Sequence, residues 1–248
     1  PEVILGMIGK NKKKMKTGNY SLVFRPQPQT YPGLSGNELV HGQFYDEWVV
    51  NDHCHICDDQ GNWHLFGITH PLTSAANIHE GELQLFHAMA PSPLGPYRDL
   101  GTILPPSERP LDLPEIHAPY IVRRDGFYLM IYGPEHFRMA RSNDLFHWET
   151  LGTVIPEVKK DARDPQILYH DGRYILSYCM GNQVYCRFSE DMFHWSDRRL
   201  LLTLADGLSP ESPFLYYNDG RFYLFVCLWD GKWDHRSVEQ AYQSQTHV

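Results

Sequence analysis

Three acidic residues occupy similar places in the sequence, each near the start of a stretch that we expect to form a strand. They are Asp52 in "EWVVNDHC", Asp164 in "ARDPQILYH" and Glu211 in "SPESPFLYY". Carboxylates that lie close together push each other's pKa values apart, so one can hold a proton while another stays ionised. If the fold gathers these three residues, they predict general acid–base or nucleophilic catalysis.

A repeated unit along the chain indicates which elements position these acids. Three runs share a strand-like stretch, an Asp-Gly pair and an aromatic-rich stretch: "HAPYIVRRDGFYLMIYG" (117–133), "RDPQILYHDGRYILSYCMG" (163–181) and "ESPFLYYNDGRFYLFVC" (211–227). Asp-Gly between two such stretches predicts a β-hairpin, because glycine tolerates the positive φ of a tight turn. The Asp-Gly pairs begin at Asp125, Asp171 and Asp219, so the intervals are 46 and 48 residues.

A second marker recurs with the same period. "SNDLFHWETLG" (142–152) returns as "SEDMFHWSDRR" (189–199), which places Trp148 and Trp195 47 residues apart. Because both tryptophans belong to the repeat, we expect them to pack within it. A weaker copy of the hairpin is "NDHCHICDDQGNWHLFGITH", with its turn at Gln60-Gly61.

Four strands for each unit of 40 to 50 residues predict an all-β fold, a β-propeller of four-stranded antiparallel blades. A β-sandwich is the alternative, but it does not explain the regular period. Units begin near four residues: Asp46, Glu115, Asp161 and Ser209. The fourth unit ends abruptly at Val248, so we expect the last blade to be incomplete and a C-terminal part of the natural protein to be missing.

Two regions are predicted. Residues 1–40 form an N-terminal segment, whose "NYSLVFRPQ" could contribute one closing strand, and residues 41–248 form the propeller. The first strand of each propeller blade lines the central channel, so residues near its start converge on one mouth. Those residues are Trp48, Asn51 and Asp52, then His117, then Arg163 and Asp164, then Glu211. Carboxylates around one funnel suit glycoside hydrolysis, which needs one protonated and one ionised carboxyl group.

The sequence resembles the five-bladed β-propeller glycoside hydrolases, over about residues 44–230. "HAPYIVRRDGFYLMIYG", "SPLGPYRDLG" and the Glu-x-Pro of "SPESPFLYY" are similar to family 43, to which family 62 is related. "EWVVND" before "GNWHLFG", and "RDP", are similar to families 32 and 68. The resemblance implies five blades and a glycosidase.

The resemblance also implies roles for the three acids. Asp52 matches the general base of inverting family 43 and the nucleophile of retaining family 32. Asp164 matches the residue that orients substrate and tunes the acid, and Glu211 matches the general acid. His53 stands where family 43 usually has proline, and Ser212 stands where family 32 usually has cysteine, so the substrate family stays open.

Other residues near the mouth are candidates for sugar binding. Trp48 and Trp229 could stack on a sugar face, and Arg163 could bind sugar or pair with an acid. Asn51 and His117 complete the set. Several site residues have a structural alternative: Asp52 in an Asn-Asp turn, Glu211 as an exposed loop acid between two prolines, His117 in the core, and Arg163 with Asp164 as a surface ion pair.

The predicted function is an exo-acting glycosidase on furanosides or pentosides, of the arabinofuranosidase or xylosidase type. A retaining enzyme of the fructosidase type is one alternative. A catalytically silent carbohydrate-binding propeller is another, and a protein-interaction propeller is a third. The partner that we expect is an oligosaccharide or polysaccharide, and such a substrate favours a secreted or periplasmic protein over a cytosolic one.

Composition excludes other partners. The net charge is −8, and the basic run "KNKKKMK" is short, so we expect no nucleic acid. No apolar stretch reaches the roughly 18 residues of a membrane span, so we expect no membrane partner.

Metal and cofactor expectations follow from the cysteines and from the chemistry. Cys54 and Cys57 form one Cys-x-x-Cys, but a structural zinc site usually needs a second ligand pair, so we predict strand cysteines and no metal site. The chemistry requires no cofactor. Some family 43 propellers hold calcium in the channel, but no ligand cluster in the sequence indicates it.

Overall fold

The computed structural model describes residues 22–36, 38–72, 82–105, 115–155, 161–229 and 246–247. Seventeen strands and no helix occur within these ranges. The all-β prediction is therefore confirmed, and the described part of the chain has no helix that could cross a membrane.

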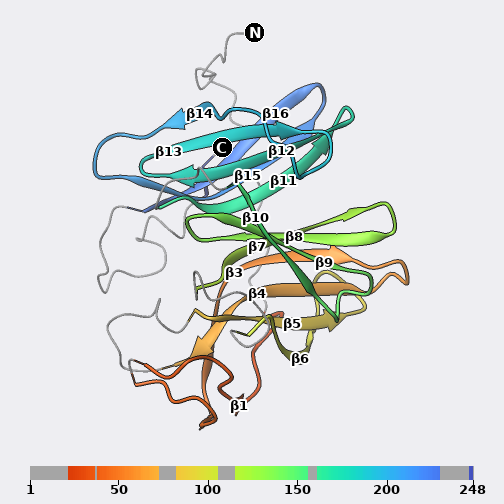
Figure 1. The fold of residues 1–248 in the computed structure, drawn as a ribbon, viewed down its shortest axis with the longest axis vertical. Coiled ribbons are helices and arrows are strands. Elements are labelled where there is room, and N and C mark those ends of the chain that lie inside the picture. The colour runs from red at the N-terminus through yellow and green to blue at the C-terminus, as the bar shows by residue number, and fades with distance from the viewer. Residues whose placement is uncertain are drawn as a thin grey trace.

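Three antiparallel sheets have four strands each, in chain order (Figure 1). The first sheet consists of β3 (Trp48–Cys57), β4 (Trp63–Pro71), β5 (Gln84–Ala90) and β6 (Arg98–Ile103). The second consists of β7 (His117–Arg124), β8 (Phe127–Gly133), β9 (Phe137–Ser142) and β10 (Glu149–Ile155). The third consists of β11 (Arg163–His170), β12 (Arg173–Met180), β13 (Gln183–Ser189) and β14 (Arg199–Thr203).

Within the described residues, the fourth sheet has three strands, and the last of them covers two residues. Its strands are β15 (Ser209–Asn218), β16 (Arg221–Trp229) and β17 (Thr246–His247). The prediction of an incomplete last blade agrees with this sheet. The count of five blades stays a prediction, because the described residues form four sheets of the propeller type.

The predicted hairpin turns are present in the second, third and fourth sheets. Both residues of each Asp-Gly pair have a positive φ: Asp125 (47°) with Gly126 (85°), Asp171 (49°) with Gly172 (77°), and Asp219 (50°) with Gly220 (76°). Positive φ at both central positions matches the twist of the flanking strands, so each pair closes a tight hairpin.

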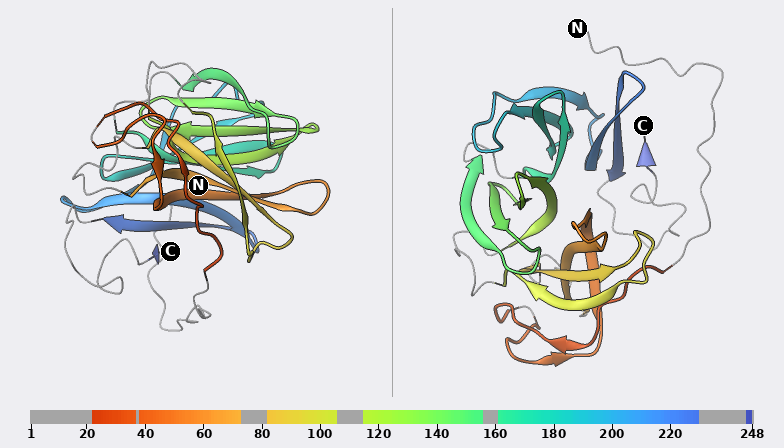
Figure 2. Two further views of the ribbon diagram at one scale, coloured as in Figure 1. Left: turned by 90° about the horizontal axis from the view of Figure 1, so that it is seen from below. Right: turned by 90° about the vertical axis from the view of Figure 1, so that its right-hand side faces the viewer.

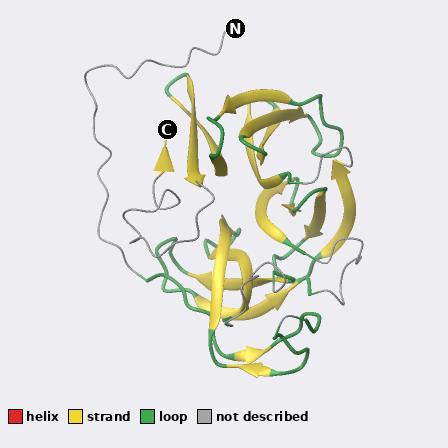
Figure 3. Cartoon of the chain, turned by 90° about the vertical axis from the view of Figure 1, so that its left-hand side faces the viewer, coloured by secondary structure: helices red, strands yellow, loops and turns green. Residues whose placement is uncertain are grey.

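The sheets follow one another around an arc, and their first strands are adjacent (Figures 2 and 3). We call β3, β7, β11 and β15 the inner strands; β3 contacts β7, β7 contacts β11, and β11 contacts β15. The hydrophobic core lies between neighbouring sheets. Phe66 and Ile68 pack with Met130 of the second sheet, and Ile131 packs with Leu176 of the third. This radial packing belongs to a propeller and excludes the β-sandwich.

The repeated His-Trp marker forms a turn at the end of the third strand in two sheets. In the first copy, Asp144 accepts hydrogen bonds from the backbone of Phe146 and His147, and the Trp148 indole donates to the Leu145 carbonyl. The second copy repeats these bonds through Asp191 and Trp195. Both tryptophans pack against the cores, as predicted.

The described part of the N-terminal segment contacts the first sheet. Phe24 stacks on Phe86, with ring centroids 4.7 Å apart, and the Val23 carbonyl accepts from the Tyr97 amide at 2.9 Å. The strand β1 (Gln29–Thr30) pairs with β2 (Phe44–Tyr45) in a small separate sheet. None of the described residues of this segment pairs with the fourth sheet. The closing strand stays a prediction, because residues 19–21 of "NYSLVFRPQ" lie outside the described ranges.

Candidate active site

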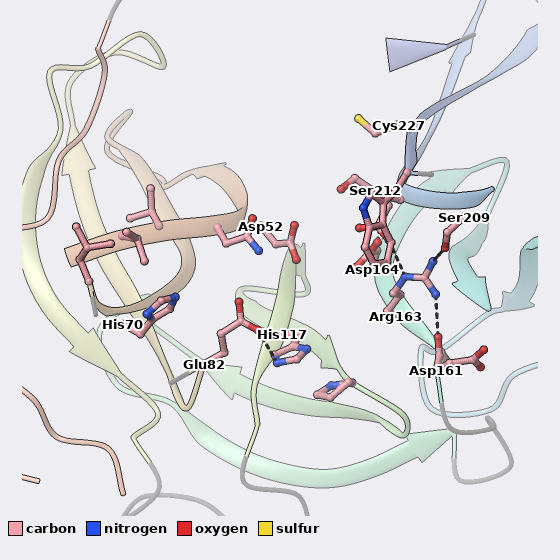
Figure 4. A pocket seen from close by; sticks show the side chains of 18 residues that line it. Asp52, His70, Glu82, His117, Asp161, Arg163, Asp164, Ser209, Ser212 and Cys227 are labelled. Atoms are coloured by element: carbon pink, nitrogen blue, oxygen red, sulfur yellow. Dashed lines mark hydrogen bonds and ion pairs between the residues drawn. The ribbon is translucent and has the colours of Figure 1, made fainter. Parts of the chain in front are cut away.

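A cavity of about 760 Å³ lies where the four inner strands begin. Its wall contains seven of the eight site residues predicted from the sequence: Asn51, Asp52, His117, Arg163, Asp164, Glu211 and Trp229. Figure 4 shows Asp52 and His117 on one side of this cavity and Arg163 and Asp164 on the other. The fold therefore brings together residues that are up to 178 positions apart in the chain.

One irregularity, repeated in three inner strands, aims these side chains. His117, Arg163 and Glu211 each pair with the second strand of their sheet, and the register shifts immediately afterwards. The next residue has a positive φ and is followed by proline in every case: Ala118 (44°), Asp164 (57°) and Ser212 (49°). Because proline donates no hydrogen bond, the ladder is interrupted there, and the resulting bulge turns the preceding side chains toward the cavity.

Asp52 lies in a smaller bulge, and a glycine on the next strand makes room for it. The register shifts between Asn51 and His53 where β3 pairs with β4. A Cβ atom on Gly67 would lie 2.8 Å from the Asp52 carbonyl oxygen and 2.7 Å from the Phe86 ring. Only a residue without a side chain fits here without movement, so Gly67 allows β3 to keep the bulge that carries Asp52.

Arg163 connects the third and fourth sheets and contacts the predicted acid. Its Nε donates to Glu211 Oε1 at 3.2 Å, and its terminal nitrogens donate to the carbonyls of Asp161, at 3.1 Å, and Pro210, at 2.8 Å. A further bond goes to the Ser209 hydroxyl. Four of the five N–H donors of the guanidinium are therefore used within the protein.

Asp164 is buried and is fixed by the neighbouring inner strand. Its Oδ2 accepts the backbone N–H of Ser212 at 2.8 Å, and the residue is 8% exposed. Burial raises the pKa of the Asp164 carboxyl, while the Ser212 hydrogen bond and the positive charge of Arg163 act in the opposite direction. The alternative of a surface ion pair between Arg163 and Asp164 does not describe this geometry.

Asp52 shares the cavity with several negative charges. Burial raises the pKa of the Asp52 carboxyl well above its usual value, and the charges of Asp164, Glu211 and Glu82 raise it further. The surroundings of Glu211 differ, because the positively charged Arg163 lies 3.2 Å from its carboxyl group.

Glu82 is a fourth acid in the cavity wall, and sequence reasoning missed it. Its side chain is 2% exposed and its Oε2 lies 3.0 Å from His117 Nε2. Glu82 precedes β5 outside every repeated motif, so no sequence signal indicated it. Among the other wall residues that were not predicted, five have side chains that could contact a polar ligand: His70, Asp161, Ser209, Ser212 and Cys227. Cys227 could have been found, because it is the cross-strand partner of Glu211 in the predicted hairpin.

The prediction for Trp48 is wrong. Its side chain is buried with Tyr31 and Leu39, and its Nε1 donates to the Tyr45 carbonyl at 3.1 Å. Tyr45 of the small β1–β2 sheet packs against the same cluster, so Trp48 contacts this sheet and does not line the cavity. Trp229, at the end of β16, remains the tryptophan of the cavity wall.

The structure also describes the cysteines and possible metal ligands. None of the five cysteines forms a disulfide bond, and Cys54 is buried. Within the described ranges, no group of three or more His, Cys, Asp or Glu side chains is arranged to hold a metal ion.

Comparison with solved structures relates this geometry to known folds. A thermostable family-43 glycoside hydrolase superimposes with a TM-score of 0.60 at 14% identity, covering 72% of this chain and 64% of that one. The family-32 β-fructofuranosidase of Bombyx mori gives 0.56 at 18% identity, covering 73% and 41%. Sucrose-6-phosphate hydrolase from Lactobacillus gasseri gives 0.57 at 19% identity, covering 72% and 40%. The chain has the fold of the propeller glycoside hydrolases.

Sequence comparison adds one curated relative. It is the 1,2-β-oligomannan phosphorylase of Thermoanaerobacter sp. (strain X514), 30% identical over 105 residues, which are 39% of this chain and 35% of the relative. No family model matches the chain. The chain thus spans less than two thirds of each protein named here.

Proposed function

We propose that this protein is a glycosidase that hydrolyses O-glycosyl bonds of furanosides or pentosides from a chain end. The observation that carries the proposal is the meeting of Asp52, Asp164 and Glu211, from three different inner strands, in one cavity. A cavity of about 760 Å³ is of the size that encloses a small organic ligand. Exo cleavage suits such a site, since it needs to enclose only the terminal part of a glycan.

In this proposal, Glu211 donates the proton to the leaving oxygen. Asp52 acts from the other side, as the base for water or as the nucleophile, and Asp164 orients the sugar. These roles require Glu211 to carry a proton when the substrate is bound. The glycosidic oxygen only accepts hydrogen bonds, so a bound substrate favours a protonated Glu211.

The test compares the wild type with Glu211→Gln and Asp52→Asn. The substrates are aryl α-L-arabinofuranoside, aryl β-D-xyloside, sucrose and a fructan oligomer. We expect Glu211→Gln to lose roughly 10²- to 10⁴-fold in kcat on substrates with poor leaving groups. A dinitrophenyl leaving group, which needs little protonation, should restore much of that loss in Glu211→Gln but not in Asp52→Asn.

The panel also separates the alternatives. Release of pentose by the wild type supports the arabinofuranosidase or xylosidase type, and release of fructose supports the fructosidase type. If no substrate is cleaved but calorimetry detects sugar binding, the protein is a carbohydrate-binding propeller. Equal loss in both variants with every leaving group would contradict the division of roles between Glu211 and Asp52.

Phosphorolysis is the second candidate, because the curated relative is named as a phosphorylase. A phosphate ion in the cavity needs cationic partners. Among the described residues of the cavity wall, Arg163 is the one arginine or lysine, and four of its donors are already used. This charge distribution favours water over phosphate as the acceptor. Cleavage of mannobiose that depends on added inorganic phosphate would reverse that choice.

A further inference from the structure

The wall of the cavity also contains a carboxylate in contact with an imidazole, the side chains of Glu82 and His117. Glu82 Oε2 lies 3.0 Å from His117 Nε2, and the carboxylate side chain is 2% exposed against 18% for the imidazole. Figure 4 shows the Glu82 carboxylate pointing toward Asp52 from the same side of the cavity, with the His117 ring extending into the space beside it.

Two contacts hold this pair in place. Besides the side-chain contact to His117, the Glu82 carbonyl accepts the backbone N–H of Ile116 at 3.0 Å. The neighbouring Glu115 carbonyl accepts from the buried Arg138 at 2.8 Å. Backbone and side chain of Glu82 therefore both join the start of β5 to the start of β7, and the carboxylate is fixed before any ligand arrives.

Stability alone does not account for a buried carboxylate at this position. Burial of a carboxylate costs free energy that its partners must offset, and well-packed apolar side chains of similar volume are often equally stable or more stable at such a position. The charge of Glu82 also acts on the catalytic acids, since it raises the pKa of both Asp52 and Asp164. Glu82 thus lies close enough to both to face the same bound group.

We propose that Glu82 and His117 form a recognition subsite for adjacent hydroxyl groups of a neutral sugar, with Glu82 as the ionised acceptor and His117 as the group that it orients. A carboxylate has two oxygens and can accept from two neighbouring hydroxyls at once. Asp52, Glu82, Asp164 and Glu211 surround the space with carboxyl groups, so a uronic acid or a sugar phosphate would meet like charge. The subsite rests on the proposed glycosidase function, which it deepens by naming the substrate class.

The kinetic test is a double-mutant cycle. It compares the wild type and Glu82→Gln on a parent substrate and on forms of that substrate that lack one hydroxyl group. Glu82→Gln keeps the shape of the side chain but replaces one accepting oxygen with a donor and removes the charge. On the parent aryl glycoside that the wild type cleaves, we expect KM to rise about 10- to 100-fold, the range for a hydrogen bond to a charged group. On the 2-deoxy or the 3-deoxy form of that glycoside, which keeps only one of the two hydroxyls, we expect the variant and the wild type to differ by a clearly smaller factor than on the parent, because one of the two hydrogen bonds is already absent.

The control is Glu115→Gln, which changes a nearby acid that is not part of the cavity wall. It should leave KM unchanged on all substrates. A general structural effect of Glu82→Gln would raise KM equally on parent and deoxy substrates, and that result would overturn the subsite. If Glu82→Gln does not fold, His117→Gln takes its place in the same cycle.

A binding measurement distinguishes failure of the subsite from failure of the proposed function. Calorimetry uses L-arabinose, D-xylose, D-fructose and D-glucuronate, the last of which is D-xylose with an added carboxylate. Binding of a neutral sugar that is lost in Glu82→Gln, together with at least tenfold weaker binding of D-glucuronate than of D-xylose, supports the subsite even without turnover. Unchanged binding in the variant, or no binding of any neutral sugar to the wild type, refutes it.

Discussion

Arg163 and Glu211 occupy equivalent positions in successive sheets, 48 residues apart, and their side chains form an ion pair of 3.2 Å across the two inner strands. The next residues along each strand are joined as well, because Asp164 accepts the Ser212 N–H. The repeat that builds the fold therefore also builds the site. Equivalent positions of the two strands carry different side chains. Arg163 of β11 binds Glu211 of β15, and the backbone of β15 binds Asp164 of β11.

The first prediction concerns the geometry of this ion pair. Lysine keeps the charge of Arg163 but cannot make the same four bonds from one planar group. We expect Arg163→Lys to lower kcat about 10²-fold, the cost of a misplacement of about 1 Å at the reacting centre. The loss should appear in kcat on the glycoside that the wild type cleaves, because Glu211 is displaced.

Arg187→Lys is the matched control for that variant. Arg187 is also buried and donates to the Ser196 carbonyl at 2.8 Å, but it lies in β13, outside the cavity wall. If Arg187→Lys loses as much activity as Arg163→Lys, the loss comes from a general disturbance of the fold. The contact between Arg163 and Glu211 would then not be its cause.

The second prediction concerns Gly67, which touches no ligand. A Cβ atom there would lie 2.8 Å from the Asp52 carbonyl and 2.9 Å from the Asn51 carbonyl. Gly67→Ala should shift the bulge that carries Asp52 and lower kcat by about 10²-fold, while the cost of overpacking should be about 1–3 kcal/mol of stability.

The control for Gly67 is Gly36→Ala, where an added Cβ meets nothing within 4 Å. It should change neither activity nor the urea midpoint of unfolding. Full activity in Gly67→Ala would show that β3 tolerates the shift and that Asp52 does not need its present position.

Much of the fold could be predicted from the sequence because its signals are local. The Asp-Gly turns and the Asp-x-x-His-Trp segment each fix their own geometry through backbone conformation and bonds within a few residues. Because the hairpin and the His-Trp segment recur with the same period, they belong to one unit, and the runs between them complete its four strands. The repeat also indicates where Asp164 and Glu211 lie, because both occur at the start of an inner strand, next to its register shift.

The remaining residues depend on contacts that no local pattern contains. Glu82 belongs to the site through its distance to His117, which is 35 positions away in the chain. Trp48 was assigned to the cavity from its position on an inner strand, but it packs with Tyr31 and Leu39 beside the small β1–β2 sheet. The small β1–β2 sheet, which covers Trp48, has strands of only two residues and thus no readable pattern.

The third prediction concerns the Asp-His turns of the second and third sheets. Burial would raise the pKa of Asp144, but the hydrogen bonds from His147 and Phe146 outweigh it and lower the pKa. Asp144 therefore stabilises the fold above the usual carboxyl range, and that contribution is lost as the pH falls. Asp144→Ala should lower the free energy of unfolding by about 1 kcal/mol at neutral pH, as for the loss of a helix cap.

Asp191 supplies an internal duplicate for this measurement, since it makes the same bonds to Phe193 and His194. Asp191→Ala should have a similar effect in urea unfolding at neutral pH. In both variants, the difference from the wild type should shrink in acid. A difference that stays constant down to about pH 2, well below the usual aspartate pKa, would mean that the side chain acts by packing and not by its charge.

The last prediction links catalysis to stability through Asp52. Because burial and the neighbouring carboxylates raise its pKa in the folded state, the carboxyl binds its proton more tightly in the folded protein than in the unfolded chain. Its favourable contribution is complete below the unfolded pKa and is lost as the pH rises through the folded pKa. Asp52→Asn removes that loss, so the variant should be more stable than the wild type by about 1 kcal/mol at neutral pH.

Urea unfolding at about pH 4 and about pH 7.5 checks the sign of this difference in stability. The gain should be present at the higher pH and small at the lower one. A variant that is less stable than the wild type at the higher pH would mean that Asp52 is held as an ion by the fold, and the proton would then have to reside elsewhere in the site.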